Sequence, residues 1–282
     1  MSIINSHLIS GSTILLTNKS VISPDFWKFL KLNKPSSISG VPFTFEMLNK
    51  LRFFSMKLPY IKSITQAGGK MDLNLNKEIA DYCKNTNKHL YVMYGQTEAS
   101  PRISYLPNQK AIKKIGSIGI PIPDGNLSLI DSKGNIIDDN EIEGELVYKG
   151  PNVCLGYASE ISDLNKKDEN NGILYTGDVA YRDNDNYFYV TGRKKRFVKL
   201  FGNRINLDYV QRLLNDKICE NACVGNDKFL LIYLVEANKI NEAKDFIVNK
   251  FKLSSKFIKI KLIDEIPKNS YGKTIYSNLN IS

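Results

Sequence analysis

The sequence predicts an α/β protein with three parts: part of an open, largely parallel sheet, a β-rich segment resembling a distorted barrel, and a small α+β domain. Apolar strands alternate with helical segments up to about residue 105. Short strands separated by turns follow up to residue 193, and strands alternate with helices again from residue 194 to residue 282. The expected domains are therefore 1–193, divided into 1–105 and 106–193, and 194–282.

The first part is expected to contain four strands. They are predicted at residues 13–17, 36–41, 62–67 and 89–93. Helices begin where a capping residue or a proline supports the first turn, at Ser23–Pro24, Pro42 and Asp72. In open α/β sheets ligands gather at the carboxyl ends of strands. Gly68–Gly69 and Tyr94–Glu98 directly follow two of these strands, which favours a ligand site, with a flexible turn at the glycines as the alternative.

The same patterns extend through the β-rich segment and the last domain. In the β-rich segment strands are expected at 115–120, 127–130, 145–149, 174–175 and 187–191. A polar stretch at 159–171 indicates a surface loop or a short helix. In the last domain strands are expected at 196–201, 228–235 and 257–263, with helices at 206–217 and 241–251.

The stretch from Tyr175 to Ile205 combines the features of a ligand site. Thr176–Gly177–Asp178 is expected to form a tight turn that presents a carboxylate, and residues 183–186 are expected to form the turn of a hairpin that leads to Gly192–Arg193. A carboxylate accepts hydrogen bonds from vicinal ribose hydroxyls, and an arginine offers a planar fork of donors. These groups suit a nucleotide. The alternatives are an ordinary β-turn and a solvated cationic surface at Arg193–Arg196.

Four further segments accompany this stretch, in the order typical of one enzyme family. They are Gln66–Gly69, Tyr94–Glu98, Gly144–Tyr157 and Pro267–Lys273. With these five segments the chain resembles the acyl-adenylate-forming, or AMP-binding, enzymes over nearly its whole length: acyl-CoA and aryl-CoA synthetases, adenylation domains and luciferases. The resemblance implies an ATP-dependent acid–thiol ligase. It would activate a small carboxylic acid to acyl-AMP and transfer it to coenzyme A or to the phosphopantetheine of an acyl carrier protein, with the C-terminal domain as a mobile cap.

The resemblance implies which residues of the first part bind ATP or AMP and Mg²⁺. The nucleotide-binding residues would be Ala67, Gly68, Gly69, Tyr94, Gly95 and Gln96. Tyr94 would stack on the adenine, with the glycine backbone on the other side of the base; a core aromatic residue is the alternative. Thr97 and Glu98 would be catalytic, Thr97 by contacting phosphate and Glu98 by ligating Mg²⁺, a hard cation that prefers oxygen.

The second half of the chain would supply the remaining site residues. Asp178 would accept from both ribose hydroxyls, and Arg193 would bind ribose or phosphate oxygens. Lys273 would be catalytic, bridging the substrate carboxylate and the α-phosphate as a mobile point charge; an exposed lysine near the C-terminus is the alternative. The residues implied for the hinge and for thiol transfer are Lys195, Lys199 and Gly202.

One sequence feature of this family has no counterpart in this chain. These enzymes carry a phosphate loop rich in Gly, Ser and Thr upstream, and Ser10–Thr13 is too short to be that loop. The chain therefore resembles a C-terminal portion, as a fragment, an interrupted frame or a split enzyme, and a separate N-terminal fragment is an expected partner. A catalytically inactive AMP-binding remnant or interaction module is the alternative function. The acid is not indicated. Its candidate pocket walls, equally candidates for the core, are Phe43, Phe45, Met71 and Ala99.

Composition bounds the class of protein. The chain is 42% hydrophobic and 24% charged over 282 residues, which is ordinary for a globular protein, and no apolar run predicts a membrane span. The net charge of +10 and the pI of about 9.2 favour binding of phosphates or of an acidic carrier protein. No nucleic-acid motif is present, so no nucleic acid is expected. Four scattered cysteines indicate reduced thiols in a cytoplasmic protein.

Overall fold

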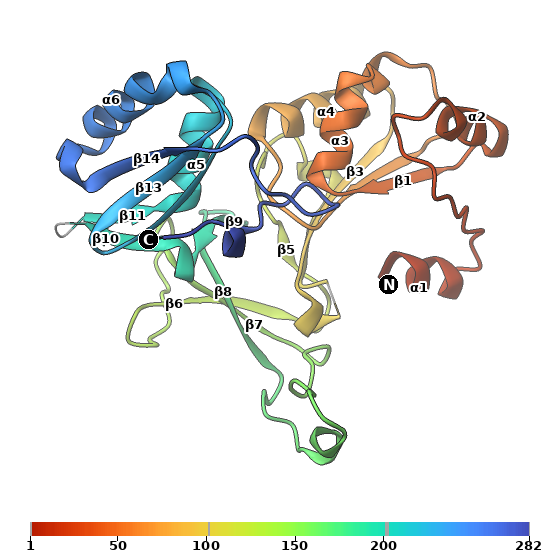
Figure 1. The fold of residues 1–282 in the computed structure, drawn as a ribbon. Coiled ribbons are helices and arrows are strands. Elements are labelled where there is room, and N and C mark those ends of the chain that lie inside the picture. The colour runs from red at the N-terminus through yellow and green to blue at the C-terminus, as the bar shows by residue number, and fades with distance from the viewer. Residues whose placement is uncertain (1, 101, 201–202, 282) are drawn as a thin grey trace. The chain divides into compact units, whose positions relative to one another are not determined.

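The computed structural model describes residues 2–100, 102–200 and 203–281, so Gly202 lies outside the described residues. The chain, drawn in Figure 1, divides into two compact units. Unit 1 consists of Met1–Thr176 and Ala180–Val190, and unit 2 of Gly177–Val179 and Thr191–Ser282. Both units combine sheets with helices, which confirms the α/β fold class. The domain limits expected at residues 105 and 193 stay predictions.

The sheet that begins unit 1 has the strand order β1-β2-β3-β4-β5. These strands are β1 (Ser37–Gly40), β2 (Ser63–Gln66), β3 (His89–Tyr94), β4 (Ser104–Leu106) and β5 (Ile120–Pro121). The first three run parallel, whereas β4 and β5 are antiparallel to their neighbours. The carboxyl ends of β1, β2 and β3 therefore meet at one edge of the sheet.

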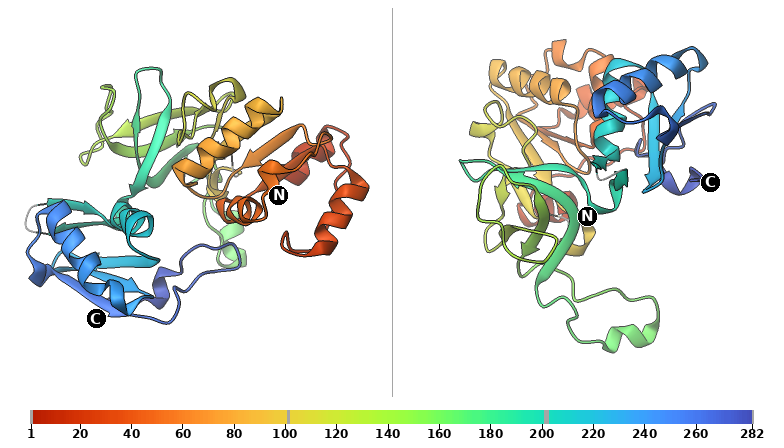
Figure 2. Two further views of the ribbon diagram at one scale, coloured as in Figure 1. Left: turned by 90° about the horizontal axis from the view of Figure 1, so that it is seen from above. Right: turned by 90° about the vertical axis from the view of Figure 1, so that its left-hand side faces the viewer.

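Helices cover this sheet where local capping allows them to begin. The helices described in unit 1 are α1 (Ser2–Ile9), α2 (Pro24–Asn33), α3 (Pro42–Lys50) and α4 (Leu73–Asn85). The Asp72 carboxylate accepts hydrogen bonds from the backbone N–H groups of Asn74 (2.9 Å) and Leu75 (3.0 Å), as expected of an N-cap. α3 packs on β1 and α4 on β3, as Figures 1 and 2 show.

The first core of unit 1 lies between these helices and the sheet. Its fully buried side chains include Phe45, Leu48, Phe53, Ile61, Ile64 and Ile79. The strand predicted at residues 13–17 is wrong, because this segment has no regular secondary structure and Leu16 is 78% exposed. An apolar run becomes a strand only beside a partner, and within the described part of the chain β1 pairs with β2 alone.

The β-rich part forms a sheet with the order β6-β7-β8-β9. Its strands are β6 (Asn126–Ile130), β7 (Gly144–Lys149), β8 (Ile173–Arg182) and β9 (Phe188–Arg193). β8 and β9 form the expected hairpin, and a second apolar core surrounds the fully buried Tyr148. Among the described residues no strand pair closes this sheet into a barrel, so its strand order is that of an open sheet.

A charged cluster around Lys114 holds the turn of this hairpin. The Lys114 Nζ atom lies 2.7 Å from a carboxylate oxygen of Asp183 and 2.6 Å from one of Asp185. Burial alone would raise the pKa of Asp183, but hydrogen bonds from Lys114 and from the backbone of Tyr187 and Asp185 outweigh it and lower the pKa. The charged form of Asp183 is therefore favoured in the folded protein.

Unit 2 contains the β10–β11 ladder and the sheet β12-β13-β14, with two helices among its described residues. The elements are β10 (Phe197–Leu200), β11 (Asn203–Asn206), α5 (Leu207–Lys217), β12 (Asn221–Asn226), β13 (Phe229–Leu234), α6 (Ile240–Phe251) and β14 (Ile258–Leu262). β13 pairs antiparallel with β12 and parallel with β14. No helix in the described ranges is both long and apolar enough to cross a membrane.

β13 is covered on both faces, which explains its continuous apolar sequence. Alternate residues of a strand point to opposite faces. One set packs in the core with α5 and α6: Leu230, Ile232 and Leu234. The other set packs with the C-terminal segment that follows β14: Leu231 and Tyr233, against Ile266 and Leu279. The C-terminal segment is therefore part of the folded body of unit 2.

Replacing Lys114 with methionine should lower the thermal unfolding midpoint at neutral pH, because Asp183 and Asp185 lose their cation. Ionised Asp183 contributes to the free energy of unfolding. This contribution is complete above the ordinary aspartate pKa of about 3.9, and it is lost as the pH falls through the lower pKa that Asp183 has in the folded protein. The difference in thermal unfolding midpoint between Lys114→Met and the wild type should therefore shrink below about pH 4. Lys113→Met, at an exposed neighbour, is the control. Equal differences at neutral and acidic pH would contradict this account.

Candidate functional site

The turn after β2 offers its backbone at the carboxyl edge of the parallel strands. Gly68 has φ +83°, a left-handed conformation that favours glycine. The buried Gln66 side chain donates to the Gly69 carbonyl (2.8 Å), and the Ala67 N–H donates to the Gly40 carbonyl (3.1 Å). The turn is thus held from both sides while Gly68 and Gly69 remain exposed, so a flat ligand can approach this backbone closely.

Tyr94, Gly95 and Gln96 leave β3 at the same edge. The Tyr94 ring is half-buried and packs against the core of the β-rich part. Its carbonyl accepts a hydrogen bond from the Ile103 N–H at 2.9 Å. The Gln96 side chain donates to the Thr176 carbonyl at 2.8 Å, which ties the end of β3 to β8. Partial burial of Tyr94 fits a ring that has one part in the core and another part open to a ligand.

Thr97 and Glu98 follow in a single 3₁₀ turn, η2 (Thr97–Ala99). Thr97 is exposed and Glu98 is half-buried. The hydroxyl of Tyr157 donates to Glu98 Oε1 at 2.6 Å. This hydrogen bond raises the pKa of Tyr157, so the hydroxyl stays protonated at neutral pH. The turn therefore presents one hydroxyl and one oriented carboxylate just beyond the strand.

The hydroxyl and carboxylate oxygens of the η2 turn are ligands of the kind that Mg²⁺ prefers. Mg²⁺ usually keeps several waters and is held by one or two carboxylates together with substrate phosphates. In residues 2–100, 102–200 and 203–281, no group of three or more His, Cys, Asp and Glu side chains is placed to hold a metal ion. Glu98 is therefore suited to share a hard cation with a bound phosphate rather than to form a complete protein site.

The contact between Tyr157 and Glu98 could not be predicted from the sequence. The two residues are 59 positions apart, and an exposed tyrosine in a polar loop has no distinctive pattern. The one signal was that Gly156–Tyr157 closes the Gly144–Tyr157 segment, one of the five that carry the family resemblance.

Asp178 and Arg193 form an ion pair between β8 and β9. The Arg193 Nε atom lies 3.2 Å from Asp178 Oδ1. Asp178 is only 4% exposed, whereas the Arg193 side chain is 69% exposed. The hairpin therefore brings together the carboxylate and the guanidinium that the sequence places at its two ends, with the guanidinium accessible to an anion.

Gly192 allows a close approach of Asn206. A Cβ on Gly192 would lie 2.5 Å from Asn206 Nδ2. This nitrogen donates to the Thr191 carbonyl at 3.1 Å, while Asn206 Oδ1 accepts from the N–H groups of Asp208 and Tyr209 as the N-cap of α5. One asparagine thus attaches the end of β9 directly to α5.

Lys195 is exposed in the 3₁₀ turn that follows β9, η5 (Lys194–Arg196). The next residue is firmly attached. The Arg196 guanidinium donates to an Asp208 carboxylate oxygen at 2.8 Å and lies 3.8 Å from the centre of the Tyr276 ring. Lys195 therefore lies between two points at which the chain is bonded to the start of α5, the Thr191 carbonyl and the Arg196 guanidinium.

Lys273 lies in a tight hairpin near the C-terminus. The Asn269 side chain accepts from the N–H groups of Tyr271 and Lys273, both at 3.0 Å, and Gly272 has φ +75°. Just beyond, the Tyr276 hydroxyl donates to a glutamine of α5 at 3.0 Å. The Lys273 side chain is exposed on this anchored hairpin. Its backbone position is therefore well defined while its ammonium group is free to reach a ligand.

The remaining predicted residues add little to the geometry of the candidate site. Lys199 is exposed on β10, and Gly202 lies outside the described residues. Among the candidate walls of an acid pocket, Phe43 is 39% exposed. The other three are buried in apolar clusters and are core residues: Phe45, Met71 and Ala99.

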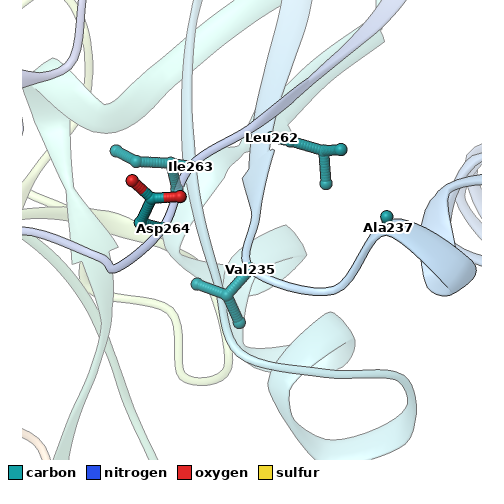
Figure 3. A pocket seen from close by; sticks show the side chains of 5 residues that line it. All are labelled: Val235, Ala237, Leu262, Ile263 and Asp264. Carbon is teal, nitrogen blue, oxygen red and sulfur yellow. The ribbon is translucent and has the colours of Figure 1, made fainter.

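A pocket of about 530 Å³ lies at the ends of β13 and β14, and Figure 3 shows the side chains that line it. Its lining residues are Val235, Ala237, Leu262, Ile263 and Asp264. None of the residues predicted as site residues is among them. Four apolar side chains and one carboxylate offer no cation or hydroxyl to a phosphate, so this lining does not suit a nucleotide.

Comparison with known proteins relates the chain to one family. The family described as AMP-binding enzyme matches residues 1–158. A long-chain-fatty-acid–CoA ligase of Yersinia pestis is 27% identical over 285 residues, covering 96% of this chain and 49% of that protein. A probable 4-coumarate–CoA ligase of Dictyostelium discoideum is 31% identical over 221 residues, covering 73% of this chain and 40% of that protein. The chain spans about half the length or less of these relatives.

Solved structures share the fold. The o-succinylbenzoate coenzyme A synthetase of Bacillus subtilis, solved with AMP, aligns with a TM-score of 0.78 at 24% identity, covering 100% of this chain and 58% of that one. An amide bond synthetase of Marinactinospora thermotolerans aligns with a TM-score of 0.74 at 16% identity, covering 96% and 56%. At these identities the likeness shows the fold alone. Because the family match covers more than half of its residues, the chain belongs to the AMP-binding enzyme family.

Proposed function

We propose that this chain takes part in the ATP-dependent activation of a carboxylic acid to an acyl-AMP and in its transfer to the thiol of coenzyme A. The observation that carries the proposal is the η2 turn, which places the Glu98 carboxylate at the carboxyl edge of a parallel sheet in a member of the AMP-binding family. The coenzyme A ligases among the relatives support the thiol step.

The proposed reaction has two steps. A carboxylate oxygen of the acid attacks the α-phosphorus of ATP, the bond from that phosphorus to the oxygen bridging the β-phosphate breaks, and pyrophosphate leaves. The thiol sulfur then attacks the acyl carbon, the thiol proton is lost to solvent, and AMP leaves. Because both steps place negative charge on oxygen, donors and cations held in position would lower both barriers.

The proposed roles in unit 1 concern the base, the phosphates and the metal. Tyr94 stacks on adenine, and the exposed backbone of the preceding glycine turn borders the other face of the base. The other backbone-lining residues are Ala67, Gly68, Gly69, Gly95 and Gln96. Thr97 donates its hydroxyl to a phosphate oxygen. Glu98 holds Mg²⁺, which when bound neutralises phosphate charge.

The proposed roles in unit 2 concern the sugar, the acid and the change between steps. Asp178 accepts from the ribose hydroxyls, and the exposed guanidinium of Arg193 donates to ribose or phosphate oxygens. Lys273 bridges the acid and the α-phosphate during adenylation. Lys195 is the pivot between the two steps, a role supported by its exposure in the turn that follows β9. The thiol step is assigned to Lys199 and Gly202.

Exposed apolar side chains near the N-terminus support a covering segment. Leu8 is 63% exposed, Ile9 89% and Leu16 78%, and β1 is an edge strand of its sheet. We infer that a polypeptide segment of the kind that makes up the rest of the relatives covers this surface and supplies a phosphate loop, in the same chain or as a separate partner. The net charge of +10 further supports an acidic carrier protein with a phosphopantetheine thiol as an acceptor besides coenzyme A.

A catalytically inactive AMP-binding remnant is the second candidate function. Acid-dependent exchange of labelled pyrophosphate into ATP separates the two functions. Exchange should appear with a fatty or aryl acid, for the chain alone or after addition of the N-terminal half of a matching ligase. No exchange with any acid in either preparation would favour the remnant.

Asp178→Asn should weaken AMP binding about 10- to 100-fold, because a charged acceptor of two hydroxyl hydrogen bonds is lost. Isothermal calorimetry on the full chain measures the dissociation constant. Asp81→Asn, at a half-exposed carboxylate of α4 that pairs with Lys77, is the control and should bind AMP as the wild type does. Unchanged AMP affinity in folded Asp178→Asn would reject the ribose role.

Lys273→Ala should reduce pyrophosphate exchange at least about 100-fold while sparing thiol transfer from supplied acyl-AMP, since the proposed bridge forms only in the first step. Lys250→Ala, at an exposed lysine of α6, is the matched control. Rapid-quench measurement of the two half-reactions tests this. Equal loss in both half-reactions would count against a separate adenylation role for Lys273.

A further inference from the structure

Two loops of unit 1 that are distant in the sequence are bonded together. We call residues 97–100 the Glu98 turn and residues 150–157 the clasp loop. The Cys154 N–H donates to the Glu98 carbonyl at 2.8 Å, and the Ser100 hydroxyl donates to a clasp-loop carbonyl at 3.2 Å. Both bonds involve backbone atoms, so the clasp loop fixes the path of the Glu98 turn and not only its side chains.

Asn152 is the centre of this attachment. Its side-chain amide donates to the Ala99 carbonyl at 2.6 Å and to the Arg102 carbonyl at 3.0 Å. Its Oδ1 atom accepts from the hydroxyl of Tyr148, whose ring is fully buried in the core of the β-rich part. Both amide protons and the acceptor are therefore used. A Cβ on Gly150 would collide with the Tyr148 hydroxyl, so glycine there keeps the connection possible.

Tyr157 completes the clasp at the side chain of Glu98. Its hydroxyl donates to Glu98 Oε1 at 2.6 Å, although the tyrosine is 71% exposed and contributes little to the core. Gly156 before it has φ +154°, and a Cβ there would lie 2.6 Å from a carboxylate oxygen of Glu169. The backbone that aims Tyr157 at Glu98 therefore requires glycine at this position.

We propose that Tyr157 is a positioning residue that orients the Glu98 carboxylate for a divalent cation, on a turn that Asn152 holds in place. The inference rests on the metal role given to Glu98 in the proposed function. A glutamate side chain has three rotatable bonds, and losing that freedom opposes metal binding. A carboxylate has about four lone-pair sites on two oxygens, so it can accept from the tyrosine and bind a cation together.

Hydrogen-bond partners of metal ligands typically contribute about 10- to 100-fold to metal affinity. Tyr157→Phe should therefore weaken Mn²⁺ binding to the ATP-loaded full chain about tenfold, measured by electron paramagnetic resonance of free Mn²⁺. AMP affinity without metal should stay unchanged, because the ring remains and no nucleotide contact is assigned to the hydroxyl. Asn152→Asp, which keeps the acceptor for Tyr148 and removes both amide donors, should weaken Mn²⁺ binding too.

Two further variants separate the possible outcomes. Glu98→Gln should lose at least as much Mn²⁺ affinity as Tyr157→Phe. Tyr209→Phe, at a half-buried tyrosine of α5 outside the proposed site, should bind Mn²⁺ like the wild type. If Glu98→Gln weakens Mn²⁺ binding but Tyr157→Phe does not, the positioning role is overturned and the proposed function stands. If Tyr157→Phe lowers the affinity for AMP without metal as much as it lowers the affinity for Mn²⁺, Tyr157 has only a structural role and the positioning role is overturned. If Glu98→Gln itself changes nothing, the metal role falls and the positioning role falls with it.

Discussion

The parallel register of β2 and β3 is the constraint on which the candidate site of unit 1 depends. The pairing runs from Ser63 with His89 to Gln66 with Val92. Gly68 and Tyr94 each lie two residues beyond the last of these pairs, so the glycine turn and the end of β3 finish side by side. A slip of one residue would turn the Tyr94 side chain to the opposite face of the sheet. Burial of Ile64, Leu90 and Val92 on one face of the sheet opposes that slip.

In unit 2 the segments that carry the predicted residues are also held close to one another. Here short polar contacts, rather than register, connect the segments that carry the predicted residues. Asn206 joins the end of β9 to the start of α5, and Arg196 joins the turn after β9 to α5 and to Tyr276. The C-terminal segment is held in turn by its packing on β13. The Lys273 hairpin and the residues from Arg196 onward therefore belong to one body, which is what a cap that moves as a unit requires.

Features determined by nearby residues were predictable from the sequence, and features determined by distant ones were not. The helix capped by Asp72 and the doubly covered strand at 228–235 follow from local chemistry and apolar content, and both are present. The strand expected at 13–17 is absent, since no strand in the described ranges pairs with this segment. β12 (Asn221–Asn226) has only three apolar residues between asparagines and a glycine, and it was missed because its pairing with β13, not its own pattern, makes it a strand. The hydrogen bond from Tyr157 to Glu98 likewise depends on two loops that only the fold brings together.

The central proposal is that the segments after β2 and β3 and the β8–β9 hairpin each take part in AMP binding. Amide hydrogen exchange of the full chain, read by mass spectrometry with and without saturating AMP, tests this claim most directly. We predict slower exchange at residues 66–69, 94–98 and 176–193, and no change at Val235–Ala237 or Leu262–Asp264, which line the other pocket. Protection confined to that pocket, or its absence at residues 94–98 and 176–193 under saturating AMP, would contradict the account.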